Sequence, residues 1–339
     1  MLQRLARAAG LAALALLVAG TGTWGALFLD YAGPRGSLLR AGLVAGFALA
    51  GVATLVALFV RRWRWRAIGV YVVLCAGLAV RWWGLEPTND RNWQTDLAVL
   101  ARATIDGDKV TVHNIRNFDY RSETDYTPAY YDKTFDLREL RSLDIVTSYW
   151  MGPAIAHVFV SFGFATGDYL AISIEVRKPK GETYSTLKGL FRQYELIYIV
   201  ADERDVIRLR TNYRRDPPED VYVYRTDSSI EAKRRLFLEY MRKLNALQTQ
   251  PEFYNTLTTN CTTGIWMNSR VNPGGVPLSW KILASGHVPE YLYEQGKLDA
   301  KGLSFAELQE RAHVNARARA ADMAADFSRR IRAGGEPAR

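Results

Sequence analysis

Two stretches of 20 residues without a charged side chain constrain this chain more than any other feature. They are Gly10–Leu29 and Ala41–Val60, and about 20 apolar residues in a helix cross the hydrocarbon core of a bilayer. A third run, Ala67–Val80, has only 14 residues, but tryptophan and arginine flank both of its ends. Because these residues favour the membrane interface, they extend the run to a full span. The sequence therefore predicts three transmembrane helices, at about 10–29, 41–60 and 65–84.

The first run also has features of a cleaved signal peptide, because arginines precede its apolar core. Its length and the two runs that follow favour a retained anchor. The arginine-rich loop RRWRWR at 61–66 predicts a cytoplasmic position, and the loop at 30–40 is then outside. We expect a multi-pass protein of the bacterial inner membrane, with everything after about residue 84 on the periplasmic side. If the 14-residue run failed to span, this part would be cytoplasmic.

The formal net charge of +9 comes largely from the arginine loop and the C-terminal segment. No nucleic-acid-binding motif accompanies it. We therefore expect contact with anionic lipid headgroups and not with nucleic acid. The residues after position 84 suffice for one sizeable core.

We expect three parts: 1–84 as membrane helices, 85–300 as a folded domain, and 301–339 as a tail. Residues 304–332 are rich in arginine and alanine, which predicts one amphipathic helix that is exposed or touches the membrane surface. Residues 118–136 are aromatic and polar, which is typical of a surface loop or a substrate-facing lip. Strand-like alternation or apolar runs occur at Lys109–Ile115, Leu143–Trp150, His157–Phe164, Tyr169–Lys178, Leu196–Val200 and Val221–Tyr224. Ser228–Leu247 has the capping residues and apolar periodicity of a helix, so the fold class is α+β.

The chain has two cysteines, and Cys75 lies in the third apolar run. Cys261 would be a lone thiol in an oxidising compartment. A small buried apolar residue is the ordinary explanation for a lone cysteine. However, Cys261 follows the cap-type residues Thr258, Thr259 and Asn260, which predicts a helix beginning at or next to the thiol. Since a helix N-terminus favours a thiolate, we expect a nucleophile.

An imidazole near the thiol must come from one of four histidines. His157 opens an apolar strand, and "ATGD" predicts a hairpin to the next strand. If Gly163 pairs with Tyr169, then His157 lies opposite Glu175, whose charge interrupts an apolar alternation. A carboxylate that orients an imidazole beside a thiol is the arrangement of a nucleophilic triad. A core histidine and a solvent-facing glutamate remain the alternative interpretation.

Other chemistries lack their motifs. The chain contains no Gly-x-Ser-x-Gly, no CxxC and no HExxH, so we expect no metal and no cofactor. The order His157, Glu175, Cys261 reverses that of papain. It is similar to the circularly permuted papain-like arrangement of acyl-transferring enzymes related to the cell-wall peptidase superfamily, an analogy at the level of the fold.

The segments HVFVSFGFATGDYLAISIEVRK (157–178) and YNTLTTNCTTGIW (254–266) carry a closer resemblance. Over roughly residues 90–285 the chain resembles the Lnb N-terminal periplasmic domain family. Members of this family studied as lipoprotein N-acyltransferases imply that a fatty acyl chain moves to the α-amino group of a lipoprotein's N-terminal cysteine. The resemblance implies Cys261 as nucleophile and His157 as base, whereas Glu175 is our positional inference.

The expected enzyme is a cysteine-dependent acyltransferase that forms a thioester from a lipid ester. Its partners would be diacylglyceryl lipoproteins or phospholipids, and its oligomeric state is undetermined. Asn260 is expected to support the oxyanion or to cap the helix. Arg177, Arg192 and Tyr194 are expected to bind substrate or to make ordinary structural contacts. An envelope cysteine hydrolase (peptidoglycan peptidase, amidase or lipase) and a non-catalytic membrane-anchored binding module are the alternatives.

Overall fold

The computed structural model describes residues 1–34 and 36–333. Arg35 of the predicted outer loop and residues 334–339 of the predicted tail lie outside this part. The chain divides into two compact units. The helical unit comprises Met1–Pro87 and Ser185–Gln193, and the domain comprises Thr88–Tyr184 and Tyr194–Arg339. Residues 185–193 join the helices although they lie about 100 residues further along the chain, and no pattern in the sequence indicates this.

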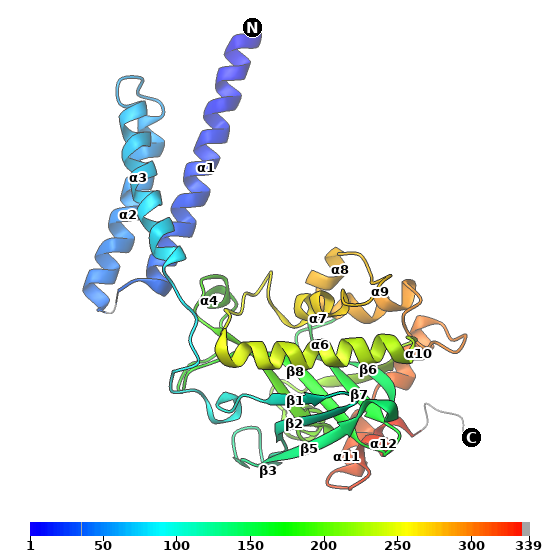
Figure 1. Cartoon of the computed structure of the whole chain (residues 1–339). Helices are drawn as coiled ribbons and strands as arrows, with labels where there is room; N and C mark the ends of the chain where they lie inside the picture. Colours follow the sequence, from blue (N-terminus) through cyan, green and yellow to red (C-terminus); the bar gives the residue numbers. More distant parts are fainter. Residues whose placement is uncertain (35, 334–339) are drawn as a thin grey trace. The chain divides into compact units, whose positions relative to one another are not determined.

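Three long helices dominate the helical unit: α1 (Leu2–Ala32), α2 (Ser37–Ala57) and α3 (Arg64–Trp83) (Figure 1). All three are long and apolar enough to cross a membrane. The flanking tryptophans and arginines extend the third apolar run to a helix of 20 residues, as predicted. A Cβ at Gly25 of α1 would lie 2.3 Å from the Phe47 ring of α2, so glycine is what lets these two helices approach closely.

The described part of the domain is built on an eight-stranded sheet. Its strands are β1 (Arg102–Asp106), β2 (Lys109–Arg116), β5 (Tyr130–Asp136), β6 (Leu140–Tyr149), β7 (Ala156–Phe164), β8 (Tyr169–Arg177), β9 (Glu195–Asp202) and β10 (Asp220–Arg225). They lie in the order β1-β2-β9-β8-β7-β6-β10, with β5 paired to β2. The mixed α+β class is as predicted, and each predicted strand is present. Residues 118–136 are more regular than expected, because they form β5 and a small sheet of β3 (Asp119–Tyr120) and β4 (Tyr126–Thr127).

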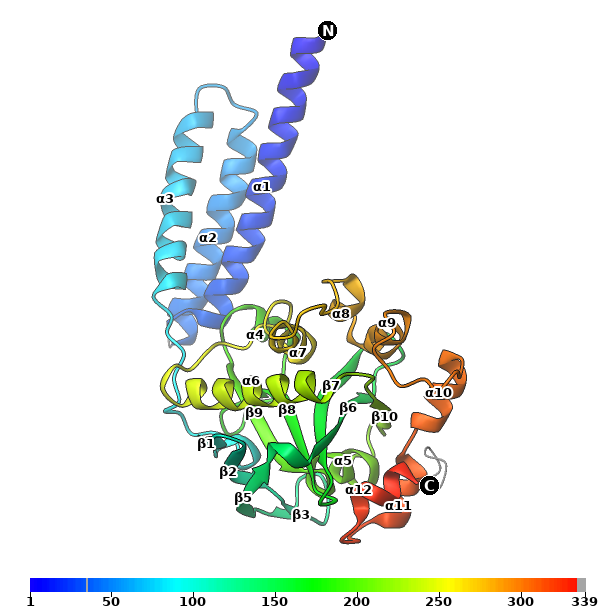
Figure 2. The ribbon, with the colours of Figure 1, turned by 45° about the vertical axis from the view of Figure 1, so that its right-hand side comes forward.

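One face of the sheet is covered by α6 (Ile230–Thr249) and α7 (Cys261–Ser269) (Figure 2). The apolar face of α6 packs on the sheet through Phe237, Tyr240 and Leu244, which are buried in the largest core cluster. Ser229 caps α6, one residue after the predicted cap. The short helices α8 (Trp280–Leu283) and α9 (Val288–Glu294) follow α7 in the chain.

The C-terminal segment differs from the prediction of a single amphipathic tail helix. It forms α10 (Phe305–Ala312), α11 (Asn315–Ala321) and α12 (Phe327–Arg332). Together with α5 (Glu203–Arg208), residues of α11 and α12 form a second core cluster on the other face of the sheet. Phe327 and Ile331 are fully buried there. The segment is therefore part of the domain, because its apolar residues cover a sheet face that would otherwise be open.

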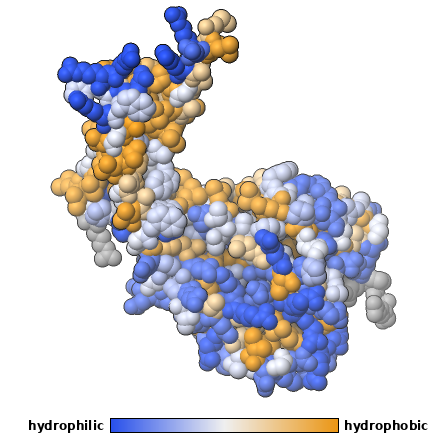
Figure 3. Space-filling model, turned by 45° about the horizontal axis from the view of Figure 1, so that its top comes forward, coloured by the Kyte–Doolittle hydropathy of each residue, from blue (hydrophilic) through white to orange (hydrophobic). Residues whose placement is uncertain are grey.

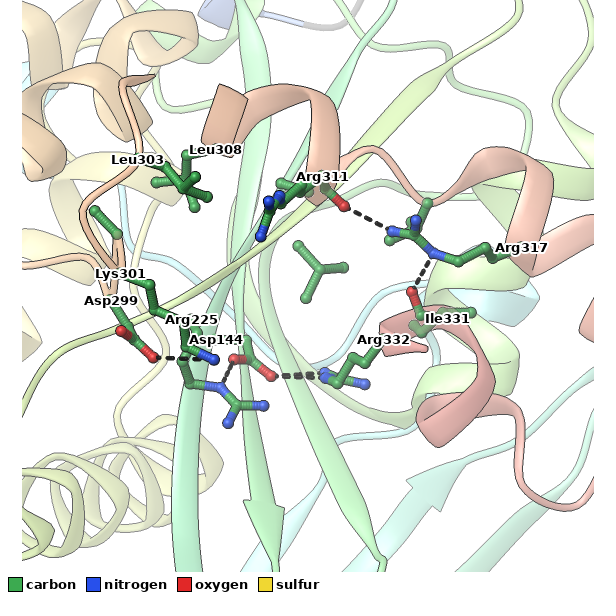
Figure 4. A pocket seen from close by; sticks show the side chains of 14 residues that line it. Asp144, Arg225, Asp299, Lys301, Leu303, Leu308, Arg311, Arg317, Ile331 and Arg332 are labelled. Carbon is green, nitrogen blue, oxygen red and sulfur yellow. Dashed lines mark hydrogen bonds and ion pairs between the residues drawn. The ribbon is translucent and has the colours of Figure 1, made fainter. Parts of the chain in front are cut away.

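Ion pairs fix the end of this segment. The guanidinium of Arg332 lies 2.7 Å from carboxylate oxygens of both Asp144 and Glu203, and its side chain is only 11% exposed. Figure 4 shows Arg332 and Asp144 at the edge of a small cavity of about 90 Å³ between the sheet and α10–α12. None of the predicted site residues lines this cavity.

Candidate thiol site

Cys261 is the first residue of α7, and the sequence before it folds into a capping box. The Asn260 side chain accepts a hydrogen bond from the Thr263 N–H at 3.0 Å, and the Thr263 hydroxyl accepts one from the Asn260 N–H at 2.9 Å. A Cβ at Gly264 would lie 2.7 Å from a methyl of Ile174 on β8. Glycine therefore allows the first turn of α7 to lie directly on the sheet, which brings the thiol to the strands.

The strands β7 and β8 separate next to the thiol of Cys261. Gly163 pairs with Tyr169, as predicted, but the ladder ends at Val160 and Ile172 although both strands continue. Beyond that point the backbone N–H of Val158 donates a hydrogen bond to the Cys261 sulfur. Because the strands separate here, Cys261 at the start of α7 on one face of the sheet can reach side chains that project from the other face.

The thiol and the imidazole of His157 form a hydrogen bond. Burial lowers the pKa of His157, but the charge of Glu175 and the bonds to Cys261 and Glu175 outweigh it and raise the pKa to about 9. Burial raises the pKa of Cys261, but the hydrogen bond and charge of His157 outweigh it and lower the pKa. The raised pKa of His157 and the lowered pKa of Cys261 both favour a thiolate–imidazolium pair at neutral pH.

Ser173 links the imidazole to its carboxylate. The Ser173 hydroxyl donates to Glu175 Oε1 at 2.7 Å and lies 2.7 Å from His157 Nε2. Because the one hydroxyl proton is used on the carboxylate, the serine oxygen accepts from Nε2–H. Nε2 is also 3.1 Å from Glu175 Oε1, so Nδ1 is left to face the thiol. Ser173 was not predicted, although its position two residues before Glu175 on the same strand face was a usable signal.

Behind Glu175 lies a buried arginine that the sequence did not indicate. The Arg210 guanidinium is 3.1 Å from Glu175 Oε1, and its side chain is only 4% exposed. It belongs to a π-helical turn at Leu209–Tyr213, a local irregularity that is frequent at functional sites. Burial raises the pKa of Glu175, but the charges of His157 and Arg210 outweigh it and lower the pKa well below its usual value. Glu175 therefore stays ionised beside the imidazole.

Asn260 caps α7, and both ends of its amide group are hydrogen-bonded near the start of the helix. Its amide nitrogen donates to the Thr256 carbonyl at 2.7 Å, and its oxygen is used by α7. The first N–H groups of a helix have no partner within it. In the part of the chain that the structure describes, those of Cys261 and Thr262 are the first-turn donors left for a developing oxyanion beside the thiol.

Two of the three predicted substrate-binding residues are embedded in the domain. Arg177 donates to the carbonyls of Leu97 and Ala98 and to the Asn89 side chain, and it is 2% exposed. Burial lowers its pKa to about 10. Tyr194 is fully buried and donates to the Thr183 carbonyl at 3.0 Å. Both side chains therefore hold the fold together.

The third of these residues, Arg192, belongs to the helical unit. Its guanidinium lies 4.6 Å from the centre of the Trp82 ring and donates to the Trp82 carbonyl at 2.9 Å. It thus fastens residues 185–193 to the end of α3.

The other histidines also lie apart from the thiol: His113 contacts Asp132, His287 contacts Glu290, and His313 contacts Asp220. No cluster suited to a metal ion occurs among the described residues.

Large apolar side chains are exposed on the segments around the thiol. The β6–β7 loop, which leads into His157, is joined to the segment after α8 by a hydrogen bond from the Gly286 N–H to the Ala154 carbonyl. Thr262 of α7 bonds the carbonyl of Ile282 in α8. The apolar residues exposed on these segments, here called the apolar rim, are Trp150, Met151, Ile155, Leu257, Met267, Leu278, Trp280 and Leu283. Figure 3 shows apolar surface on α1–α3 and in patches among the hydrophilic side chains of the domain.

The fold and site define a membrane-associated α+β protein with a thiol, an imidazole and a carboxylate in one cluster. Residues 126–286 match the family model of the Lnb N-terminal periplasmic domain, the family that the sequence resembles. The match includes Cys261, His157 and Glu175. Together with the three apolar helices, it fits a membrane protein with a periplasmic domain. No curated protein and no solved structure matched the chain.

Proposed function

We propose that this protein is a membrane-anchored lipoprotein N-acyltransferase of the bacterial inner membrane, with its catalytic domain in the periplasm. The observation that carries the proposal is the thiol of Cys261, hydrogen-bonded to an imidazole whose other nitrogen faces a carboxylate. This cluster supports covalent catalysis at an acyl carbon. The order of its residues supports a permuted papain-like domain.

The acylation step consumes the thiolate–imidazolium pair. The Cys261 sulfur attacks the ester carbonyl of a phospholipid or a diacylglyceryl lipoprotein, so that a C–S bond forms and the C–O ester bond breaks. The leaving alcohol takes the proton of His157, which becomes neutral. The N–H groups at the start of α7 are the donors available for the oxyanion.

The transfer step restores the pair. The α-amino group of a lipoprotein's N-terminal cysteine attacks the thioester, so that a C–N bond forms and the C–S bond breaks. The amine proton goes to His157, and the thiolate leaves. Water in place of the amine would give hydrolysis instead. The apolar spans and the apolar rim support a lipid as the acyl donor, because both favour contact with acyl chains over contact with peptides.

The test is mass spectrometry of lipoprotein N-terminal peptides from cells depleted of their own N-acyltransferase. The cells receive the native protein, the Cys261→Ala variant or the Cys75→Ala variant, which removes the other cysteine as a matched control. We expect an amide-linked acyl chain with the native and Cys75→Ala proteins only. Acylation by Cys261→Ala would refute the thiol mechanism. If no form acylates although all reach the membrane, the substrate is wrong and the envelope hydrolase becomes the better candidate.

A further inference from the structure

The β8–β9 connection contains a segment, Ser185–Gln193, that packs with the membrane helices. It includes the short helix α4 (Thr186–Leu190). Phe191 is 3% exposed, and its ring lies 5.5 Å from that of Tyr31 and 6.3 Å from that of Trp24, both on α1. With Arg192 on the end of α3, the segment is fastened to two helices of the unit.

A groove of about 600 Å³ lies between this segment and α1. Its floor on α1 is made of the small residues Ala19, Gly20 and Thr23, which lie on one helix face with the larger residues that flank them. No atom lies within 4 Å of the position of a Cβ at Gly20, so this floor is open. The remaining lining residues are Leu16, Trp24, Leu27, Leu187, Leu190 and Phe191, and all of them are apolar.

The position and length of the groove indicate what fills it. All of its α1 residues, from Leu16 to Leu27, fall within the charge-free run 10–29, where the surrounding medium is lipid. The groove covers 11 residue steps (27 − 16) of α1, which at about 1.5 Å per residue is about 16 Å. One leaflet of a hydrocarbon core of about 30 Å is about 15 Å thick. With the domain on the periplasmic side, the groove runs along the outer half of α1 and matches the depth of one leaflet.

We propose that this groove binds one acyl chain of an outer-leaflet glycerolipid, and that this lipid is the acyl donor. The second part rests on the proposed function, whereas the binding of the chain does not. The small floor residues admit the chain, and the apolar side chains of Trp24, Leu187 and Leu190 line the groove beside it. The lipid bound there differs from the lipid around other faces of the helices, because it contacts protein on two sides.

The experiment uses the full chain with Cys261→Ala in lipid nanodiscs, so that no turnover is needed. The probe is a phosphatidylethanolamine that carries a photoreactive diazirine in one acyl chain, and mass spectrometry locates the crosslinks. We expect them to concentrate on residues 16–27 and 187–191. Gly20→Leu fills the groove and should lower this crosslinking about tenfold. Gly46→Leu is the matched control, because Gly46 of α2 also has no atom within 4 Å and lies outside the groove.

Crosslinks spread evenly over the lipid-facing surfaces of α1–α3 would overturn the site, as would an unchanged yield with Gly20→Leu. The donor assignment is tested separately in the lipoprotein assay, with Cys261 intact. There Gly20→Leu should lower the amount of amide-linked acyl chain, and Gly46→Leu should not. If crosslinking is specific but acylation is unaffected, the groove binds lipid and the donor assignment is wrong. If the native protein does not acylate at all, only the proposed function fails.

Discussion

Replacing Glu175 by glutamine should raise the pH at which the Cys261 thiol becomes reactive. In the native protein the pKa of His157 is about 9, which is about 2.5 above its ordinary value of 6.5. This corresponds to about 3 kcal/mol in favour of the charged ring. Burial opposes this charge, and the carboxylate of Glu175 is its largest support. Since a nearby opposite charge changes a pKa by about 1 to 3, the imidazole of the variant should begin to lose its proton near neutral pH rather than near pH 9.

Whether the pKa of Cys261 rises or falls in the variant depends on which of its neighbours has the larger effect. Glu175 itself repels the thiolate, but its effect on the pKa of Cys261 is smaller than that of His157. The hydrogen bond and charge of His157 are the two largest that lower it. Loss of the charged imidazole therefore dominates, and the pKa of the thiol rises towards its ordinary range. At pH 7 the thiolate population should fall about tenfold to a hundredfold.

The assay is the rate of alkylation by iodoacetamide from pH 5 to 10, in a Cys75→Ala background where Cys261 is the only thiol. Native and Glu175→Gln proteins should differ most near pH 7 and converge above pH 9, where the thiol ionises without help. Thermal unfolding of both proteins checks that the variant is folded. Glu139→Gln removes an exposed carboxylate that pairs with Arg141 and should leave the profile unchanged. Identical profiles for native and Glu175→Gln proteins would refute the argument.

Three further substitutions test the framework of the site. Ser173→Ala removes the hydroxyl that bridges His157 and Glu175 but keeps their 3.1 Å contact, so the alkylation rate at pH 7 should fall only about twofold to tenfold. A loss as large as that of Glu175→Gln would contradict this. Gly264→Val should push α7 off the sheet and cost about 1–3 kcal/mol, measured by thermal unfolding, and unchanged stability would show that the contact is loose. Arg332→Gln leaves Asp144 and Glu203 buried with fewer partners and should cost about 3–5 kcal/mol in chemical unfolding, whereas the exposed Arg329→Gln should cost little.

The parts of the site that local patterns determine could be predicted from the sequence. The glycine-containing turn between β7 and β8 predicts a hairpin, and the register that pairs Gly163 with Tyr169 places His157 across from Glu175. This register brings His157 and Glu175 together. Cap-type residues before Cys261 likewise predicted the start of α7, since capping is a contact within a few residues.

The parts of the site that depend on distant segments could not be predicted. Arg210 comes from a π-helical turn, which has no periodic pattern, and its contact to Glu175 joins residues 35 apart in the chain. The C-terminal segment shows the same limit. Its alanine and arginine content predicts helix, but the breaks between α10, α11 and α12 depend on how Val314 and Phe327 pack on the sheet. Asp322, with a φ of 38°, ends α11 in a backbone conformation that composition does not reveal.

The contacts around Glu175 make the reactivity of the thiol a property of the whole domain. Charges of opposite sign alternate from Cys261 through His157, Glu175 and Arg210 to Glu219, whose carboxylate lies 3.7 Å from the Arg210 guanidinium. Arg210 keeps Glu175 ionised, Glu175 keeps the imidazole charged, and the imidazole holds the thiolate. Because each member favours the charge of the next, an arginine without contact to the thiol determines how readily the thiol ionises.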